Sequence, residues 1–247
     1  MYGITLQGIT GKSLSLAPRI RRNRTTDTMP LLVTAAQTIG ISTAFVAAGG
    51  IAAFSIFDTP VLQSQPASRS LPAIRWLFSR GSHIFPQAAF LSSACFVYLA
   101  TNALVPGTPV LTQLLTLGGK STIVHGYLAA SVLTFSIGPV TGFMIPTNFA
   151  LIEKNEKKGG ARSQASANQR QDNSSDDRSA SASVEGKGQA AEFTDLSGPQ
   201  AETDQDSTPE EDQEVRQLLS KFGQMNLIRA GLMVAGGLVG LLTALEA

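Results

Sequence analysis

Four apolar stretches separated by polar segments dominate the pattern of hydrophobic and polar positions along this chain. No Asp, Glu, Lys or Arg occurs within residues 28–57, 81–119, 121–152 or 230–245. A helix needs about 20 apolar residues to cross a bilayer, and the first three stretches exceed that length. Because backbone polar groups find no water in hydrocarbon, such stretches form helices. The pattern predicts an all-α protein, a four-transmembrane-helix bundle.

Prolines and charged residues set the expected ends of the first three helices. We expect spans over residues 31–57, 83–105 and 121–148, with a proline-rich loop at 59–80 between the first two. Pro139 is expected to kink the third span, because its ring removes a backbone donor.

The fourth helix has a clear expected start. Thr208-Pro-Glu-Glu211 matches a capping box with proline at the first helical position. The helix should continue to about Leu245, but its charge-free part is too short to span alone. To cross the membrane it must also carry Asn226 and Arg229. An arginine that extends its head group to the interface is the alternative to a functional role.

The polar segments divide the chain into four regions. These are a basic, disordered N-terminal tail (1–29), the first three spans (30–152), an acidic linker (153–207), and the fourth helix with an amphipathic lead-in (208–247). The linker is rich in Gly, Ser, Ala, Gln and Asp. It buries too little apolar surface to offset the entropy of ordering, so we expect a long disordered loop between the third and fourth helices.

The N-terminal tail leaves three interpretations open. Its Arg, Lys, Ser and Thr content fits a basic tail, a mitochondrial presequence, or an untranslated segment before a start at Met29. Basic residues near the membrane are most frequent beside the 59–80 loop and the linker, which favours a cytosolic linker. We expect an integral membrane protein of an endomembrane rather than of the mitochondrion.

Few residues in this chain are able to hold a cofactor. One cysteine and two histidines cannot form a structural zinc, haem-attachment or iron–sulfur site. No phosphate loop, dinucleotide fingerprint or hydrolase elbow occurs. We therefore expect no metal and no cofactor, and no nucleic acid partner; the oligomeric state stays open. The expected partners are the lipid bilayer and a hydrophobic aromatic small molecule.

The third span ends in polar groups that an anchor does not need. The segment Pro139-Val-Thr-Gly-Phe-Met-Ile-Pro-Thr-Asn148 carries two threonines and an asparagine. An unsatisfied polar group in hydrocarbon costs several kcal/mol, roughly, so these groups should pair inside the bundle or line a cavity.

This segment, together with Gln224-Met-Asn-Leu-Ile-Arg229, resembles the fungal anthrone oxygenase-like proteins, which are small four-helix membrane proteins. The spacing of Trp76, Gly81 and Pro86 also fits. The resemblance covers residues 30–152 and 212–245. The sequence departs from the family pattern at Val140, where phenylalanine is usual, and in its longer linker.

Characterised members oxidise an anthrone to an anthraquinone with molecular oxygen in aromatic polyketide pathways. The resemblance therefore implies a cofactor-independent monooxygenase that acts on an anthrone-type polycyclic aromatic. Such a reaction needs a base and donors to a developing oxyanion. His83 and His125 are the candidate catalytic bases. The candidate substrate-binding residues are Trp76, Thr147, Asn148, Asn226 and Arg229.

A structural interpretation of the same residues stays open. Asn148 can cap a helix, and Asn226 can hydrogen-bond between helices. The alternative function is a non-catalytic integral membrane scaffold or accessory protein.

Overall fold

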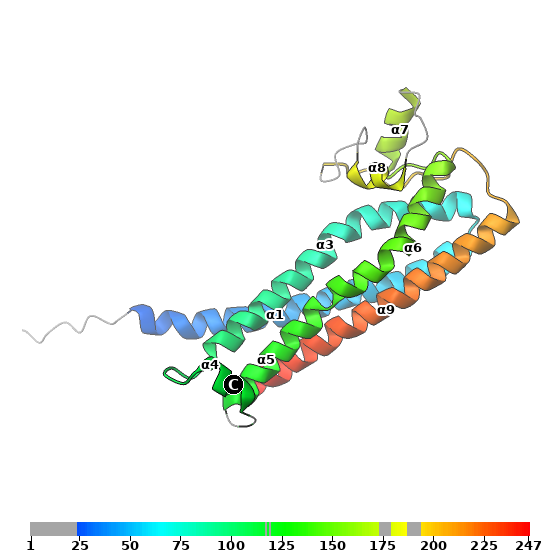
Figure 1. The fold of residues 1–247 in the computed structure, drawn as a ribbon. Helices are drawn as coiled ribbons and strands as arrows, with labels where there is room; N and C mark the ends of the chain where they lie inside the picture. Colours follow the sequence, from blue (N-terminus) through cyan, green and yellow to red (C-terminus); the bar gives the residue numbers. More distant parts are fainter. Residues whose placement is uncertain (1–23, 117, 119, 173–178, 187–193) are drawn as a thin grey trace, which may run out of the picture.

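The computed structural model is a bundle of long helices, without strands among the residues that it describes (Figure 1). It describes residues 24–116, 118, 120–172, 179–186 and 194–247, so most of the expected N-terminal tail lies outside it. In chain order the elements are α1 (Arg24–Ala53), the π-helix η1 (Phe54–Asp58), α2 (Thr59–Gln63), α3 (Ala67–Asn102), α4 (Val110–Leu115), α5 (Lys120–Phe135), α6 (Ile137–Lys157), α7 (Gln164–Asp172), α8 (Ala180–Glu185) and α9 (Pro209–Glu246).

Four helical stretches are long and apolar enough to cross a membrane, which confirms the predicted fold of an integral membrane protein. They are Pro30–Gln63, Ala67–Asn102, Ser121–Lys157 and Pro209–Glu246. α1, α3, α5, α6 and α9 run along one another in a single elongated bundle (Figure 1). α7 and α8 lie at one end of this bundle, and α4 lies at the other.

The second spanning helix is longer than the sequence pattern indicates. α3 begins at Ala67, so much of the expected loop at 59–80 is helical. Pro72 does not end the helix, although it lacks the N–H that would bond to the Ser68 carbonyl. That carbonyl instead accepts a hydrogen bond from the Thr203 N–H, at 2.8 Å. A distant segment thus replaces the donor that proline removes.

The third span consists of two helices, α5 and α6, that meet at Ser136. Pro139 has no N–H to offer the Phe135 carbonyl, and α5 ends at Phe135. The Ser136 hydroxyl donates to the Leu133 carbonyl, and the Thr141 hydroxyl donates to the Ile137 carbonyl, both at 2.7 Å. The expected kink at Pro139 is therefore a break three residues earlier.

α9 begins as predicted and runs unbroken to Glu246. The Thr208 hydroxyl accepts from the Glu211 N–H at 3.3 Å, and the Glu211 carboxylate accepts from the Thr208 N–H at 2.8 Å. This capping box satisfies two backbone donors that the first turn leaves unpaired. Beyond it, α9 packs mainly against α1 and α5.

The disordered loop expected over residues 153–207 stays a prediction, because the structure describes only parts of the linker. The described parts contain α7 and α8, and Ser163, Ser166 and Ser183 are fully buried. The expectation rests on the small apolar content of the linker. The described parts are held by hydrogen bonds to α3 and α6. Residues 173–178 and 187–193 lie outside the described part.

Candidate functional site

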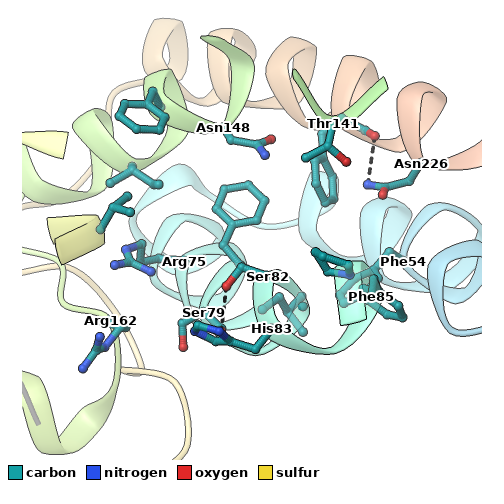
Figure 2. Close-up of a pocket in the computed structure, with 18 of the residues that line it drawn as sticks. Phe54, Arg75, Ser79, Ser82, His83, Phe85, Thr141, Asn148, Arg162 and Asn226 are labelled. Carbon is teal, nitrogen blue, oxygen red and sulfur yellow. Dashed lines mark hydrogen bonds between the residues drawn. The ribbon is translucent and has the colours of Figure 1, made fainter. Parts of the chain in front are cut away.

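A pocket of about 400 Å³ lies between α3, α6 and α9, at the end of the bundle that carries the linker (Figure 2). Helices distant in sequence contribute its walls. The lining residues are Phe54 of η1; Arg75, Leu77, Phe78, Ser79, Gly81, Ser82, His83, Phe85 and Pro86 of α3; Thr141, Asn148, Phe149 and Ile152 of α6; Arg162 and Val184 of the linker; and Phe222, Asn226 and Arg229 of α9.

Aromatic rings supply much of the apolar wall. Phe54 and Phe85 meet edge to face with ring centroids 5.6 Å apart, and Phe78 and Phe222 meet similarly at 5.1 Å. Phe54 lies at the start of η1, where the Thr59 hydroxyl donates to the Phe54 carbonyl at 2.7 Å. Short π-helices are rare and often occur at functional sites. The wall suits a flat aromatic ligand.

Arg229 places a buried cation in this pocket, and the residue is only 7% exposed. Its Nη1 donates to Asn226 Oδ1 at 2.8 Å, while its Nε has no hydrogen-bond partner in the described structure. Asn226 Nδ2 in turn donates to the Phe222 carbonyl at 3.1 Å. No Asp or Glu is among the lining residues that the structure describes. A buried charge without a counter-ion is costly, so the site favours an anionic group.

Two further predicted residues line the same pocket. The Oδ1 of Asn148 is buried and has no hydrogen-bond partner among the described residues. His83, half-buried, faces the pocket from α3, across from Asn148 and Thr141 of α6 (Figure 2). The structure thus brings together four of the predicted site residues: His83, Asn148, Asn226 and Arg229.

Three other predicted site residues do not line this pocket. The His125 Nε2 lies 2.8 Å from the Leu114 carbonyl, at an exposed place. The Trp76 indole N–H donates to the Ser197 carbonyl at 3.0 Å, and the Arg80 guanidinium lies over its ring. Thr147 is buried outside the pocket lining. Their predicted roles in catalysis and binding stay predictions that this pocket does not support.

Several pocket residues are not predicted from the sequence. Arg75, Ser79, Ser82 and Pro86 recur at helical spacing with His83 along one side of α3. This helical spacing could have indicated that these residues share one side of a helix. It was not recognised, because residues 59–80 were expected to form a loop. Arg162 and Val184 belong to the linker, whose pattern gives no corresponding signal.

The pocket lining includes side chains of the types used for proton transfer and for charge stabilisation. His83 contributes an imidazole to the lining, Arg229 a buried guanidinium, and Asn148 a buried amide oxygen without a hydrogen-bond partner among the described residues. Among the described residues, no group of three or more His, Cys, Asp or Glu is arranged to hold a metal ion. The expected lack of a metal or cofactor stays a prediction.

Comparison with known proteins identifies a family. The family described as anthrone oxygenase matches residues 75–239. No curated protein and no solved structure matches the chain. The matched range covers most of the chain and contains every pocket residue except Phe54.

Proposed function

The protein belongs to the anthrone oxygenase family, and we propose that it is an integral membrane oxygenase of an anthrone-type polycyclic aromatic. The product is the corresponding quinone, and the oxidant is molecular oxygen. The reaction class fits aromatic polyketide metabolism, in which such tricyclic rings are formed. A flat apolar substrate partitions into the bilayer, which fits a pocket inside a membrane bundle.

The reaction balances without an added reductant. Removal of a proton from C10 of the anthrone gives an enolate, whose carbanion form reacts with O₂ to give a C10 peroxide anion. This anion takes a proton back from the base and becomes the C10 hydroperoxide. Loss of water from the hydroperoxide leaves a second carbonyl. One anthrone and one O₂ thus give one quinone and one water.

Arg229 carries this proposal. Enolate formation moves negative charge onto the C9 carbonyl oxygen of the anthrone, and a donor prearranged for that charge lowers the barrier. The Arg229 guanidinium is buried, keeps an unpaired Nε and lines the pocket. Asn226 fixes its Nη1 from the preceding turn of α9. The cation is therefore positioned before the substrate arrives.

His83 and Asn148 complete the assignment. His83 is the base that takes the C10 proton, because it is the histidine that lines the pocket. The Asn148 Oδ1 accepts a hydrogen bond from a phenolic hydroxyl of the substrate, since it has no partner in the described protein. The phenylalanine rings enclose the flat ring system.

The test compares two arginine variants on the same helix. Membranes containing the protein are supplied with emodin anthrone, and quinone formation is followed by absorbance above the spontaneous rate. Arg229→Gln should lower the catalysed rate by about 10²–10³-fold, the usual effect of losing an oxyanion donor. Arg216→Gln is the control, because Arg216 is exposed and bonds to the Gln63 carbonyl outside the pocket.

Equal rates for wild type, Arg229→Gln and Arg216→Gln, all folded in membranes, would contradict the proposed role of Arg229. Rates no higher than the spontaneous one for all three proteins would favour the alternative, a non-catalytic membrane scaffold.

A further inference from the structure

The linker is tied to α3 through a buried polar network. Arg75 Nη2 donates to the Ser183 carbonyl at 2.8 Å, and Arg75 Nε donates to the Ser183 hydroxyl at 3.2 Å. The Ser183 hydroxyl donates to a Glu156 carboxylate oxygen at 2.5 Å. Arg170 pairs with the other oxygen of Glu156 at 2.8 Å. One network therefore joins α3, α6, α7 and α8.

Two more side chains of α3 hold a later part of the linker. The Trp76 indole N–H donates to the Ser197 carbonyl, and Arg80 Nη2 donates to the Asp195 carbonyl at 2.6 Å. Arg170 precedes α8 in the chain, and Asp195 and Ser197 follow it, so linker residues on both sides of α8 in the sequence are anchored to the bundle.

A glycine turn directs the linker back over the end of the bundle. α6 ends at Lys157, and Gly159 follows with a φ of +76°. The Gly160 N–H bonds to the Asn155 carbonyl at 2.8 Å, and the Gly159 N–H bonds to the Glu156 carbonyl at 3.0 Å. This Schellman pattern ends the helix and reverses the chain.

The turn and the network bring two linker residues to the pocket, Arg162 and Val184. Val184 follows the anchored Ser183 directly and is the apolar side chain that the linker offers there. We propose that the linker is a wall of the ligand site and that Val184 is a specificity-determining residue. It limits the substituents on the ring of the polycycle that lies nearest the linker. This identification of the ligand rests on the proposed function.

The test measures binding selectivity and needs no turnover. Dissociation constants are measured for emodin and for 1,8-dihydroxyanthraquinone, which lacks the methyl group and third hydroxyl of emodin, with the full-length protein in nanodiscs. Val184→Trp should weaken emodin binding about tenfold relative to the smaller quinone, within the range that a few atoms in an apolar pocket produce. Leu196→Trp is the matched control, because Leu196 is a linker residue 95% exposed and outside the pocket.

A second pair of variants tests the anchoring of α8. Ser183→Ala should reduce the selectivity between the two quinones severalfold and speed amide hydrogen exchange in residues 180–186. Ser181→Ala, at an exposed position of the same helix, should change neither. Selectivity and local hydrogen exchange together distinguish a displacement of α8 from a general loss of folding.

If the ratio of the two dissociation constants is unchanged in Val184→Trp, the linker is not a wall of the ligand site. The same conclusion follows if Leu196→Trp changes the ratio equally. If Val184→Trp changes the ratio but the protein oxidises no anthrone, the linker contributes to a ligand site and the proposed reaction is wrong. If the protein oxidises the anthrone but the ratio does not change, the proposed reaction stands and the role of Val184 is wrong.

Discussion

The most consequential single residue is the arginine at the fourth helix. Two interpretations of Arg229 followed from the sequence: a snorkelling side chain at the membrane edge and a pocket residue. A snorkelling guanidinium reaches water, whereas Arg229 is 7% exposed and lines the cavity. The structure therefore favours the pocket residue. Its unpaired Nε then requires a partner that the described protein does not supply.

The two histidines should differ in their effect on turnover. His83→Ala removes the proposed base and should lower the rate by about 10²–10⁴-fold, the usual contribution of general base catalysis. His125→Ala should leave the rate close to that of wild type, because His125 contacts the Leu114 carbonyl outside the pocket. The measurement is quinone formation in membranes, with added imidazole to rescue His83→Ala. A larger loss in His125→Ala would reverse this assignment.

Residue-scale prediction succeeded where a helix register was fixed. The capping box at Thr208 predicted the start of α9 and therefore placed Asn226 and Arg229 on the same helix. Residues three apart on a helix lie on one face, and these two side chains do interact. Thr147 and Asn148 show the limit, because adjacent residues of a helix point about 100° apart. Only Asn148 of the two lines the pocket. Tryptophan is a residue type typical of interfacial anchors. The hydrogen bond of Trp76 to Ser197 could not be predicted, because Ser197 is distant in sequence.

At the scale of elements, close contact between α9 and α5 depends on a small residue. A Cβ at Gly236 would lie 2.6 Å from Thr134 Cγ2 and 3.0 Å from the Ala130 carbonyl oxygen. Gly236→Leu should therefore destabilise the bundle by about 1–3 kcal/mol through overpacking. Gly231→Leu is the control, because a Cβ there meets nothing within 4 Å. Thermal unfolding in detergent measures both, and equal midpoints would contradict the packing.

The attachment of the linker should depend on pH through Asp195. Burial raises the pKa of this carboxyl, but hydrogen bonds from Ser163 and Ser197 and the charge of Arg80 outweigh burial, so the pKa is lowered. A lowered folded-state pKa stabilises the linker above the unfolded pKa, and this stabilisation is lost as the pH falls through the folded-state value.

The amides of residues 194–200 should accordingly lose protection against hydrogen exchange as the pH falls through the folded-state pKa of Asp195. Asp195→Asn should show weak protection without the pH dependence, since its side chain does not titrate. A wild-type profile as flat as that of the variant would show that Asp195 does not hold the linker.

Element-scale prediction failed where partners come from distant segments. The start of α3 was hidden by Pro66 and Pro72, and Thr203 replaces a bond that Pro72 removes. α7 and α8 have little apolar surface, so neither periodicity nor composition indicates them. Their stability comes from pairs such as Arg75 with Ser183 and Arg170 with Glu156. Such pairs cannot be read from local sequence.

For the whole molecule, hydropathy was sufficient for the architecture. Four charge-poor stretches predicted four spanning helices, because a bilayer leaves few other options for the backbone. The pocket required more, since it combines α3, α6, α9 and the linker. The orientation with a cytosolic linker stays a prediction from the distribution of basic residues.

We propose that this protein catalyses the oxidation of an anthrone by O₂ without a cofactor. The most direct test is purified protein in nanodiscs, treated with a chelator, with O₂ uptake and quinone absorbance recorded together on emodin anthrone. Wild-type protein should form quinone above the spontaneous rate and consume one O₂ per quinone, whereas Arg229→Gln should return towards the spontaneous rate. Folded wild-type protein that forms quinone no faster than empty nanodiscs would contradict this proposal.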